Sequence, residues 1–145
     1  MSILEAYEKG GFRNEISVLA TLVKLSLSDG VLDESEMKVI KRVADDYGFN
    51  DPFELQEIIK NHEKYSIEPA YNYDERIEQL YRLMQVIYAD DHLDKAELKI
   101  VKNSIVALGF PVKNTDVIFE TAVGLIADEA DLEDFTKAIK KVNKL

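Results

Sequence analysis

The chain has 145 residues, of which 46% are hydrophobic and 32% are charged, a composition typical of a folded globular protein. Its formal net charge is -10, from 28 acidic and 18 basic residues, so its average surface repels nucleic acid and anionic lipid and attracts cations and basic protein surfaces. Cysteine is absent, which excludes disulfides, thiolate metal sites and thiol redox chemistry.

The beginning of the chain has neither the basic region nor the apolar region of a secretory signal. No stretch approaches the roughly 20 apolar residues that a membrane-spanning helix needs. We therefore expect a cytoplasmic protein that does not insert directly into a membrane. A short helix is expected at residues 3–8, ahead of the main helices.

Apolar residues recur at helical spacing along most of the chain, and no segment sustains the period of two that strands require. The clearest runs cover residues 16–23, 37–47, 77–87 and 98–108. Pro52, Pro69 and Pro111 all fall between such runs, where a helical protein tolerates proline. We predict an all-α fold, a single-domain bundle of about seven helices over residues 1–145.

Residues 16–49 align with residues 77–110 without gaps, at the offset that superposes Asp29 on Asp90 (90 - 29 = 61). The alignment predicts an internal duplication of a helix-loop-helix unit. In each copy a glycine, Gly48 or Gly109, stands where the second helix should end in the left-handed conformation. The identical pairs include Ile16/Ile77, Leu19/Leu80, Leu22/Leu83, Asp29/Asp90, Leu32/Leu93, Asp33/Asp94, Glu36/Glu97, Lys38/Lys99, Lys41/Lys102, Gly48/Gly109 and Phe49/Phe110.

Further helices are expected beyond each copy. Asp51 and Pro52 predict the start of a helix that runs to about His62. Residues 63–74 form the longest irregular connection, and another helix is expected at residues 114–127. Asp131 is the predicted N-cap of a final helix. Repeat 1 is thus expected at about 13–62, repeat 2 at about 73–127 and the C-terminal helix at about 131–144.

The two acidic loops contain the candidate functional residues. Neither loop is an EF-hand, because the first and third ligand positions would fall on Leu25 and Leu27 in one copy and on Val86 and Tyr88 in the other. A looser site for a divalent cation, with calcium the first choice for carboxylate oxygens, is a hypothesis. Its candidate ligands are Asp29, Asp33, Glu36, Asp90, Asp91, Asp94 and Glu97.

An alternative interpretation of the same residues stays open. Asp33 and Asp94 occupy N-cap positions, and Glu36 and Glu97 follow three residues later as capping-box partners. In this interpretation the carboxylates only stabilise helix N-termini. Asp29 and Asp90 distinguish the two hypotheses, because neither is needed for the predicted caps.

The two histidines are weaker candidates. His92 lies among the aspartates of the second loop, where a solvated side chain is the simpler interpretation and metal binding the alternative. His62 near a helix end is explained by the helix dipole. The chain has no glycine-rich phosphate loop, no H-E-x-x-H zinc motif and no Glu-x-x-His pair, so no catalytic residue is predicted.

The loop sequences S-D-G-V-L-D-E-S-E, at residues 28–36, and A-D-D-H-L-D-K-A-E, at residues 89–97, resemble the tellurite-resistance protein TerB and the wider TerB-like family. The resemblance implies an all-α bundle in the bacterial cytoplasm, with an acidic site matching Asp29, Glu36, Asp90 and Glu97. The second loop departs from the family pattern, because Asp91 replaces the usual glycine.

The resemblance also implies a function. Family members are associated with tellurite and general stress resistance and are not established enzymes. They work in complexes near the membrane with other Ter proteins, and some of those proteins bind calcium. We therefore expect a non-enzymatic adaptor with protein partners, whose acidic loops bind a divalent cation or a cationic surface. The alternative is a purely structural interaction module with no metal site, which binds through an apolar groove or through Tyr65, Tyr71 and Tyr73.

Overall fold

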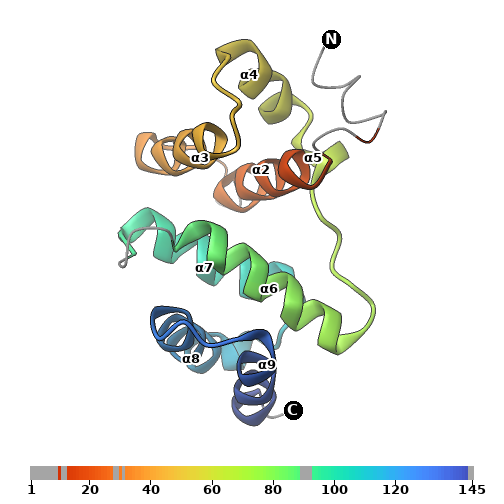
Figure 1. Cartoon of the computed structure of the whole chain (residues 1–145), viewed down its shortest axis with the longest axis vertical. Helices are drawn as coiled ribbons and strands as arrows, with labels where there is room; N and C mark the ends of the chain where they lie inside the picture. Colours follow the sequence, from red (N-terminus) through yellow and green to blue (C-terminus); the bar gives the residue numbers. More distant parts are fainter. Residues whose placement is uncertain (1–9, 11–12, 28–29, 31, 89–92, 144–145) are drawn as a thin grey trace. The chain divides into compact units, whose positions relative to one another are not determined.

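The computed structural model describes residues 10, 13–27, 30, 32–88 and 93–143. All regular secondary structure in these residues is helical, which confirms the predicted fold class (Figure 1). The short helix expected at residues 3–8 lies outside them. The elements are α2 (Arg13–Ser26), α3 (Glu34–Asp46), α4 (Pro52–Lys60), α5 (His62–Tyr65), α6 (Tyr73–Ile87), α7 (Lys95–Ala107), the 3-10 helix η2 (Val112–Asn114), α8 (Thr115–Ala127) and α9 (Leu132–Val142).

The chain divides into two compact units, Met1–Ile67 and Glu68–Leu145. Each unit contains one copy of the predicted duplication, α2 with α3 in the first and α6 with α7 in the second. The bounds of α3 and α7 are related by the offset seen in the sequence. The duplicated sequence therefore adopts the same local structure twice.

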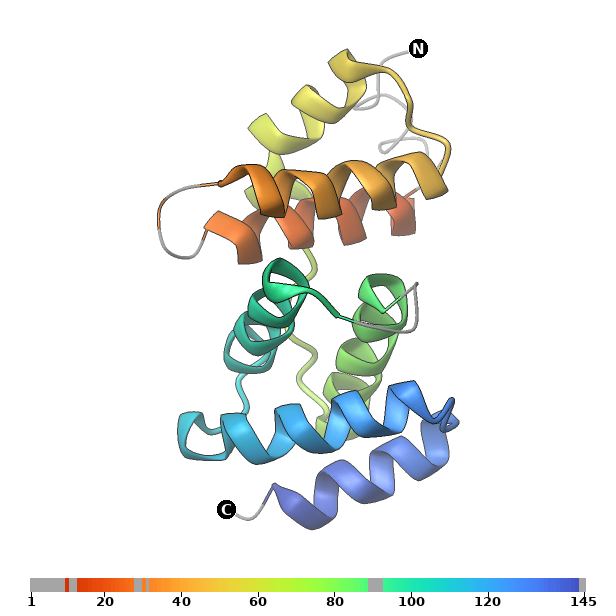
Figure 2. The ribbon, with the colours of Figure 1, turned by 90° about the vertical axis from the view of Figure 1, so that its left-hand side faces the viewer.

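In the first unit, α2 and α3 lie side by side as a helical hairpin, and α4 and α5 also contact α2 (Figure 2). The buried face of α2 supplies much of the core, including Ile16, Leu19 and Leu22 with no exposed surface. Tyr65 of α5 is only 1% exposed. Removing such side chains from water is the main force that holds these helices together.

The helix predicted to run to about His62 ends two residues earlier, and a short helix, α5, occupies the start of the connection that was predicted to be irregular. α4 ends at Lys60, and the side-chain amide of Asn61 donates to the carbonyl of Glu57 at 2.8 Å. After α5, the backbone N–H of Ile67 donates to Oγ1 of Thr21 at 2.8 Å. This hydrogen bond joins residues too distant in sequence for local patterns to predict.

In the second unit, α6 and α7 form the corresponding hairpin, and α8 and α9 form another that packs against it (Figure 2). Ile77, Leu80 and Met84 of α6 have no exposed surface and correspond to core positions of α2. Phe135 of α9 is buried against the ring of Tyr81, with ring centroids 5.1 Å apart. The second unit therefore completes its core with two long helices, where the first unit uses two shorter ones.

The ends of α3 and α7 share one backbone motif. Gly48 and Gly109 have φ of 84° and 87°, a left-handed conformation that costs residues with a Cβ roughly 1–2 kcal/mol. The N–H of Phe49 donates to the carbonyl of Ala44 at 2.8 Å, and that of Phe110 donates to Ile105 at 3.3 Å. These are the long hydrogen bonds of Schellman motifs, so the predicted glycine stops are confirmed.

The same motif ends α8 without glycine. Glu129 adopts φ of 58°, and the N–H of Ala130 donates to the carbonyl of Leu125 at 2.9 Å. Asp131 follows directly as the N-cap of α9, with its side chain accepting from the N–H of Asp134. The predicted cap of the last helix is therefore confirmed. No helix of the described residues is both long enough and apolar enough to cross a bilayer.

Candidate functional site

Both acidic loops end in a complete capping box. In the first unit, Oδ1 of Asp33 accepts from the N–H of Glu36 at 2.8 Å, and the N–H of Asp33 donates to Oε1 of Glu36 at 3.2 Å. In the second unit the matching distances for Asp94 and Glu97 are 2.9 Å and 3.1 Å. The two boxes satisfy backbone N–H groups that have no partner within the helix, and they place negative charge at its positive end.

The aspartate and the glutamate of each box differ in their access to solvent. Asp33 and Asp94 are exposed, whereas Glu36 and Glu97 are only 1% and 8% exposed. Each aspartate uses Oδ1 in its cap, so it can also take part in a cation site at the surface. Each buried glutamate would have to leave its cap to reach a solvated ion.

The structure brings the predicted site residues together in pairs, Asp33 with Glu36 and Asp94 with Glu97, one pair in each unit. Within the described part of the chain, no three side chains of the types that bind metals form a group. The remaining predicted ligands, Asp29, Asp90 and Asp91, lie outside that part, as does His92. Pooling of carboxylates from the two loops stays a prediction.

His62, the first residue of α5, is held by the end of α4. Its Nδ1 lies 2.8 Å from the carbonyl oxygen of Ile59, in the last turn of α4. A carbonyl can only accept, so Nδ1 carries the proton in this hydrogen bond. The contact with the carbonyl end of α4 agrees with the predicted role of the helix dipole.

The tyrosines of the alternative hypothesis have three different environments. Tyr65 is buried, Tyr73 accepts a 2.7 Å hydrogen bond from Nδ2 of Asn143, and Tyr71 is 100% exposed. Only Tyr71 therefore offers its whole side chain to a partner without a change in packing.

Tyr47, which follows α3, has a phenol whose pKa is raised by its surroundings. Its partial burial raises the pKa of the phenol above the usual value of 10.0, and the carboxylates of Glu15 and Asp46 raise it further. Both causes disfavour the phenolate, because it is harder to form in a less polar place beside negative charge. Tyr47 is thus neutral over the physiological range.

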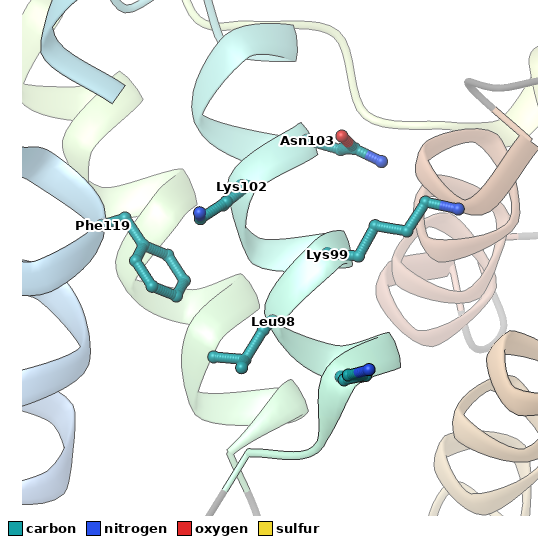
Figure 3. Close-up of a pocket in the computed structure, with 6 residues that line it drawn as sticks. Leu98, Lys99, Lys102, Asn103 and Phe119 are labelled. Atoms are coloured by element: carbon teal, nitrogen blue, oxygen red, sulfur yellow. The ribbon is translucent and has the colours of Figure 1, made fainter. Parts of the chain in front are cut away.

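Sequence reasoning missed an open groove of about 360 Å³ in the second unit. Its wall on α7 is made by Lys95, Leu98, Lys99, Lys102 and Asn103, and α8 contributes Phe119. Figure 3 shows Leu98 and Lys102 on the side of α7 that faces Phe119, with Lys99 and Asn103 pointing the other way. The helical spacing of the lysines was visible in the sequence, but the packing of Phe119 against them was not.

Comparisons of this chain with models of protein families, with curated proteins and with solved structures found no match. The resemblance to the TerB-like family therefore rests on the two acidic loops and their duplication.

Proposed function

We propose that this chain is a non-enzymatic TerB-like adaptor of the bacterial cytoplasm, with a role in stress or tellurite resistance. In this role it binds protein partners, including other Ter proteins and a membrane component of their complex. The observation that carries the proposal is the matched pair of helix-loop-helix units, each with an acidic loop closed by the same capping box.

The acidic loops supply the binding chemistry in this proposal. The capping boxes consist of Asp33 with Glu36 and of Asp94 with Glu97, so neither box requires Asp29 or Asp90. Carboxylate oxygens are hard ligands that suit calcium, and a chain with net charge -10 favours cations in general. A divalent cation or a basic surface of a partner is therefore the proposed ligand.

Calcium titration followed by amide NMR tests the cation version. We expect progressive shifts of the loop amides near Asp29 and Asp90, reduced by the variants Asp29→Asn and Asp90→Asn. Asp45→Asn is the matched control, because it removes the same charge from an exposed position of α3 away from the loop. Loop amide signals that do not shift at millimolar calcium would reject this version. It would also be rejected if Asp45→Asn reduced the shifts as much as Asp29→Asn and Asp90→Asn do.

A second candidate is an interaction module without a metal site. Its specific support is that all four described carboxylates of the site are engaged in helix caps. Capture of bacterial partners by the wild-type chain and by a double Asp29→Asn, Asp90→Asn variant separates the candidates. Unchanged capture by the variant favours the module, whereas loss of specific partners favours the adaptor with ligand-binding loops.

A further inference from the structure

The groove between α7 and α8 concentrates positive charge in a chain that is acidic overall. Lys95 and Lys102 line it together with Lys99, whose side chain points away from Phe119 (Figure 3), whereas the chain as a whole has 28 acidic and 18 basic residues. Lys95 and Lys102 are exposed and two helical turns apart, so their backbones are separated by about 10 Å along the axis of α7. The groove can therefore receive negative charge at two points along its length.

Between those two lysines the groove is apolar. Leu98 and Phe119 face each other and are partly exposed (Figure 3). The ammonium of Lys102 lies 4.9 Å from the centre of the Phe119 ring, within the range of a cation–π contact. The same ammonium is 3.9 Å from a carboxylate oxygen of Asp116, whose side chain is 90% exposed. Lys102 thus already interacts with one carboxylate, and an incoming acidic group would compete with the exposed Asp116 for it.

The corresponding surface of the first unit is different. At the repeat offset, Glu34 occupies the position of Lys95, whereas Phe119 lies beyond the aligned residues. Lys41 occupies the position of Lys102 and is also exposed. The helix caps are duplicated, but the lysine pair is not, because the counterparts of Lys95 and Lys102 in the first unit are Glu34 and Lys41.

We propose that this groove binds an acidic amphipathic helix of a partner protein. Two carboxylates seven positions apart on that helix would contact Lys95 and Lys102. An apolar side chain between them would enter the space between Leu98 and Phe119. A helix suits the site because side chains seven positions apart repeat on one face at the spacing of the two lysines. This inference rests on the proposed adaptor function and assigns the chemistry of one partner.

Charge complementarity decides the choice of occupant. A basic segment would be repelled by the lysines, and a purely apolar one would leave their ammonium groups beside uncharged surface. The volume of about 360 Å³ is near the lower end of ligand pockets, so it suits one or two side chains of a helix. Binding is therefore expected to be weak to moderate and sensitive to salt.

The probe for a direct test is a labelled peptide of about 14 residues, long enough to form helix in the bound state, with glutamates at positions i and i+7 and leucines at i+3 and i+4. Fluorescence anisotropy with the full chain should show saturable binding that weakens as salt is added. A peptide with lysines in place of the glutamates should not bind.

The matched variants are Lys102→Glu in the groove and Lys41→Glu at the equivalent position of the first unit. We expect Lys102→Glu to weaken binding by about tenfold or more and Lys41→Glu to leave it within about twofold. Lys95→Glu, which installs the residue found in the first unit, should act like Lys102→Glu. Phe119→Ala should also weaken binding, and its circular dichroism shows whether the fold is retained.

Three results would overturn the proposal. They are absence of peptide binding, an equal loss in Lys41→Glu and Lys102→Glu, and self-association of the chain that only Lys102→Glu removes. The last result would assign the groove to a second copy. Asp29→Asn and Asp90→Asn should leave peptide affinity unchanged, so the two proposals can fail separately. A calcium response without peptide binding rejects only the groove proposal. Peptide binding without a calcium response rejects only the cation site in the loops.

Discussion

Replacing Asp33 with alanine should lower the stability of the protein by removing the N-cap of α3. The lost interaction is the 2.8 Å hydrogen bond from the N–H of Glu36, and loss of such a cap costs about 1 kcal/mol, within a range of roughly 0.5–2 kcal/mol. Loss of the negative charge at the helix N-terminus adds about 0.3–1 kcal/mol. The sum is about 1–2 kcal/mol.

Asp33→Asn separates the cap from the charge. The asparagine oxygen can accept the same hydrogen bond, so this variant should lose only the charge contribution of about 0.3–1 kcal/mol. Asp94→Ala and Asp94→Asn should repeat the pattern in the second unit, where the cap has nearly the same geometry. Asp45→Ala is the control, because it lies in the last turns of α3, where an acidic side chain is unfavourable.

Thermal and urea unfolding followed by circular dichroism measure these differences. With an unfolding entropy of about 2.1 cal/mol/K per residue, a chain of 145 residues should lose about 3 °C in Tm per kcal/mol. A unit of 67 residues that unfolds by itself should lose about 7 °C. The reasoning is refuted if Asp33→Asn is as destabilised as Asp33→Ala, or if Asp33→Ala matches the wild type.

Two further predictions concern tyrosines. Because the pKa of Tyr47 is raised in the folded state, its contribution to stability is fully present below pH 10 and is lost as the pH rises through the folded value. Tyr47→Phe should therefore show a smaller fall in stability to urea above pH 10 than the wild type. The same fall in both proteins would contradict this prediction. Tyr73→Phe removes the acceptor of a hydrogen bond from buried Asn143 and should cost about 1–2 kcal/mol by urea unfolding. The exposed Tyr71→Phe should stay within about 0.5 kcal/mol, and equal effects of the two changes would exclude a role for this hydrogen bond.

Most of the helix ends could be predicted from the sequence because they depend on a few neighbouring residues. The caps at Asp33, Asp94 and Asp131 and the left-handed glycines at Gly48 and Gly109 are all where local patterns place them. The left-handed Glu129 could not be predicted in the same way. Glu129 has the same left-handed backbone as Gly48 and Gly109, but glutamate in a sequence does not indicate such a helix end.

The candidate site was predictable only in part, for the same reason. The pairing of Asp33 with Glu36 is a contact within one helical turn, whereas the burial of Glu36 depends on what the rest of the unit packs around it. The hydrogen bond from the N–H of Ile67 to Thr21 likewise connects the segment after α5 with α2. Such contacts join residues far apart in sequence, where spacing carries no information about distance.

By itself, the sequence determined the helical class, the duplication and the two capped acidic loops, since periodicity and hydrogen bonds between near neighbours are properties of a short segment. The tertiary structure decided where α7 and α8 form the groove of the second unit. Lys41 and Lys102 are equivalent in sequence, but the ring 4.9 Å from the Lys102 ammonium belongs to Phe119 of α8, which lies beyond the aligned residues. The difference arises from packing between helices, which side-chain volume and burial control.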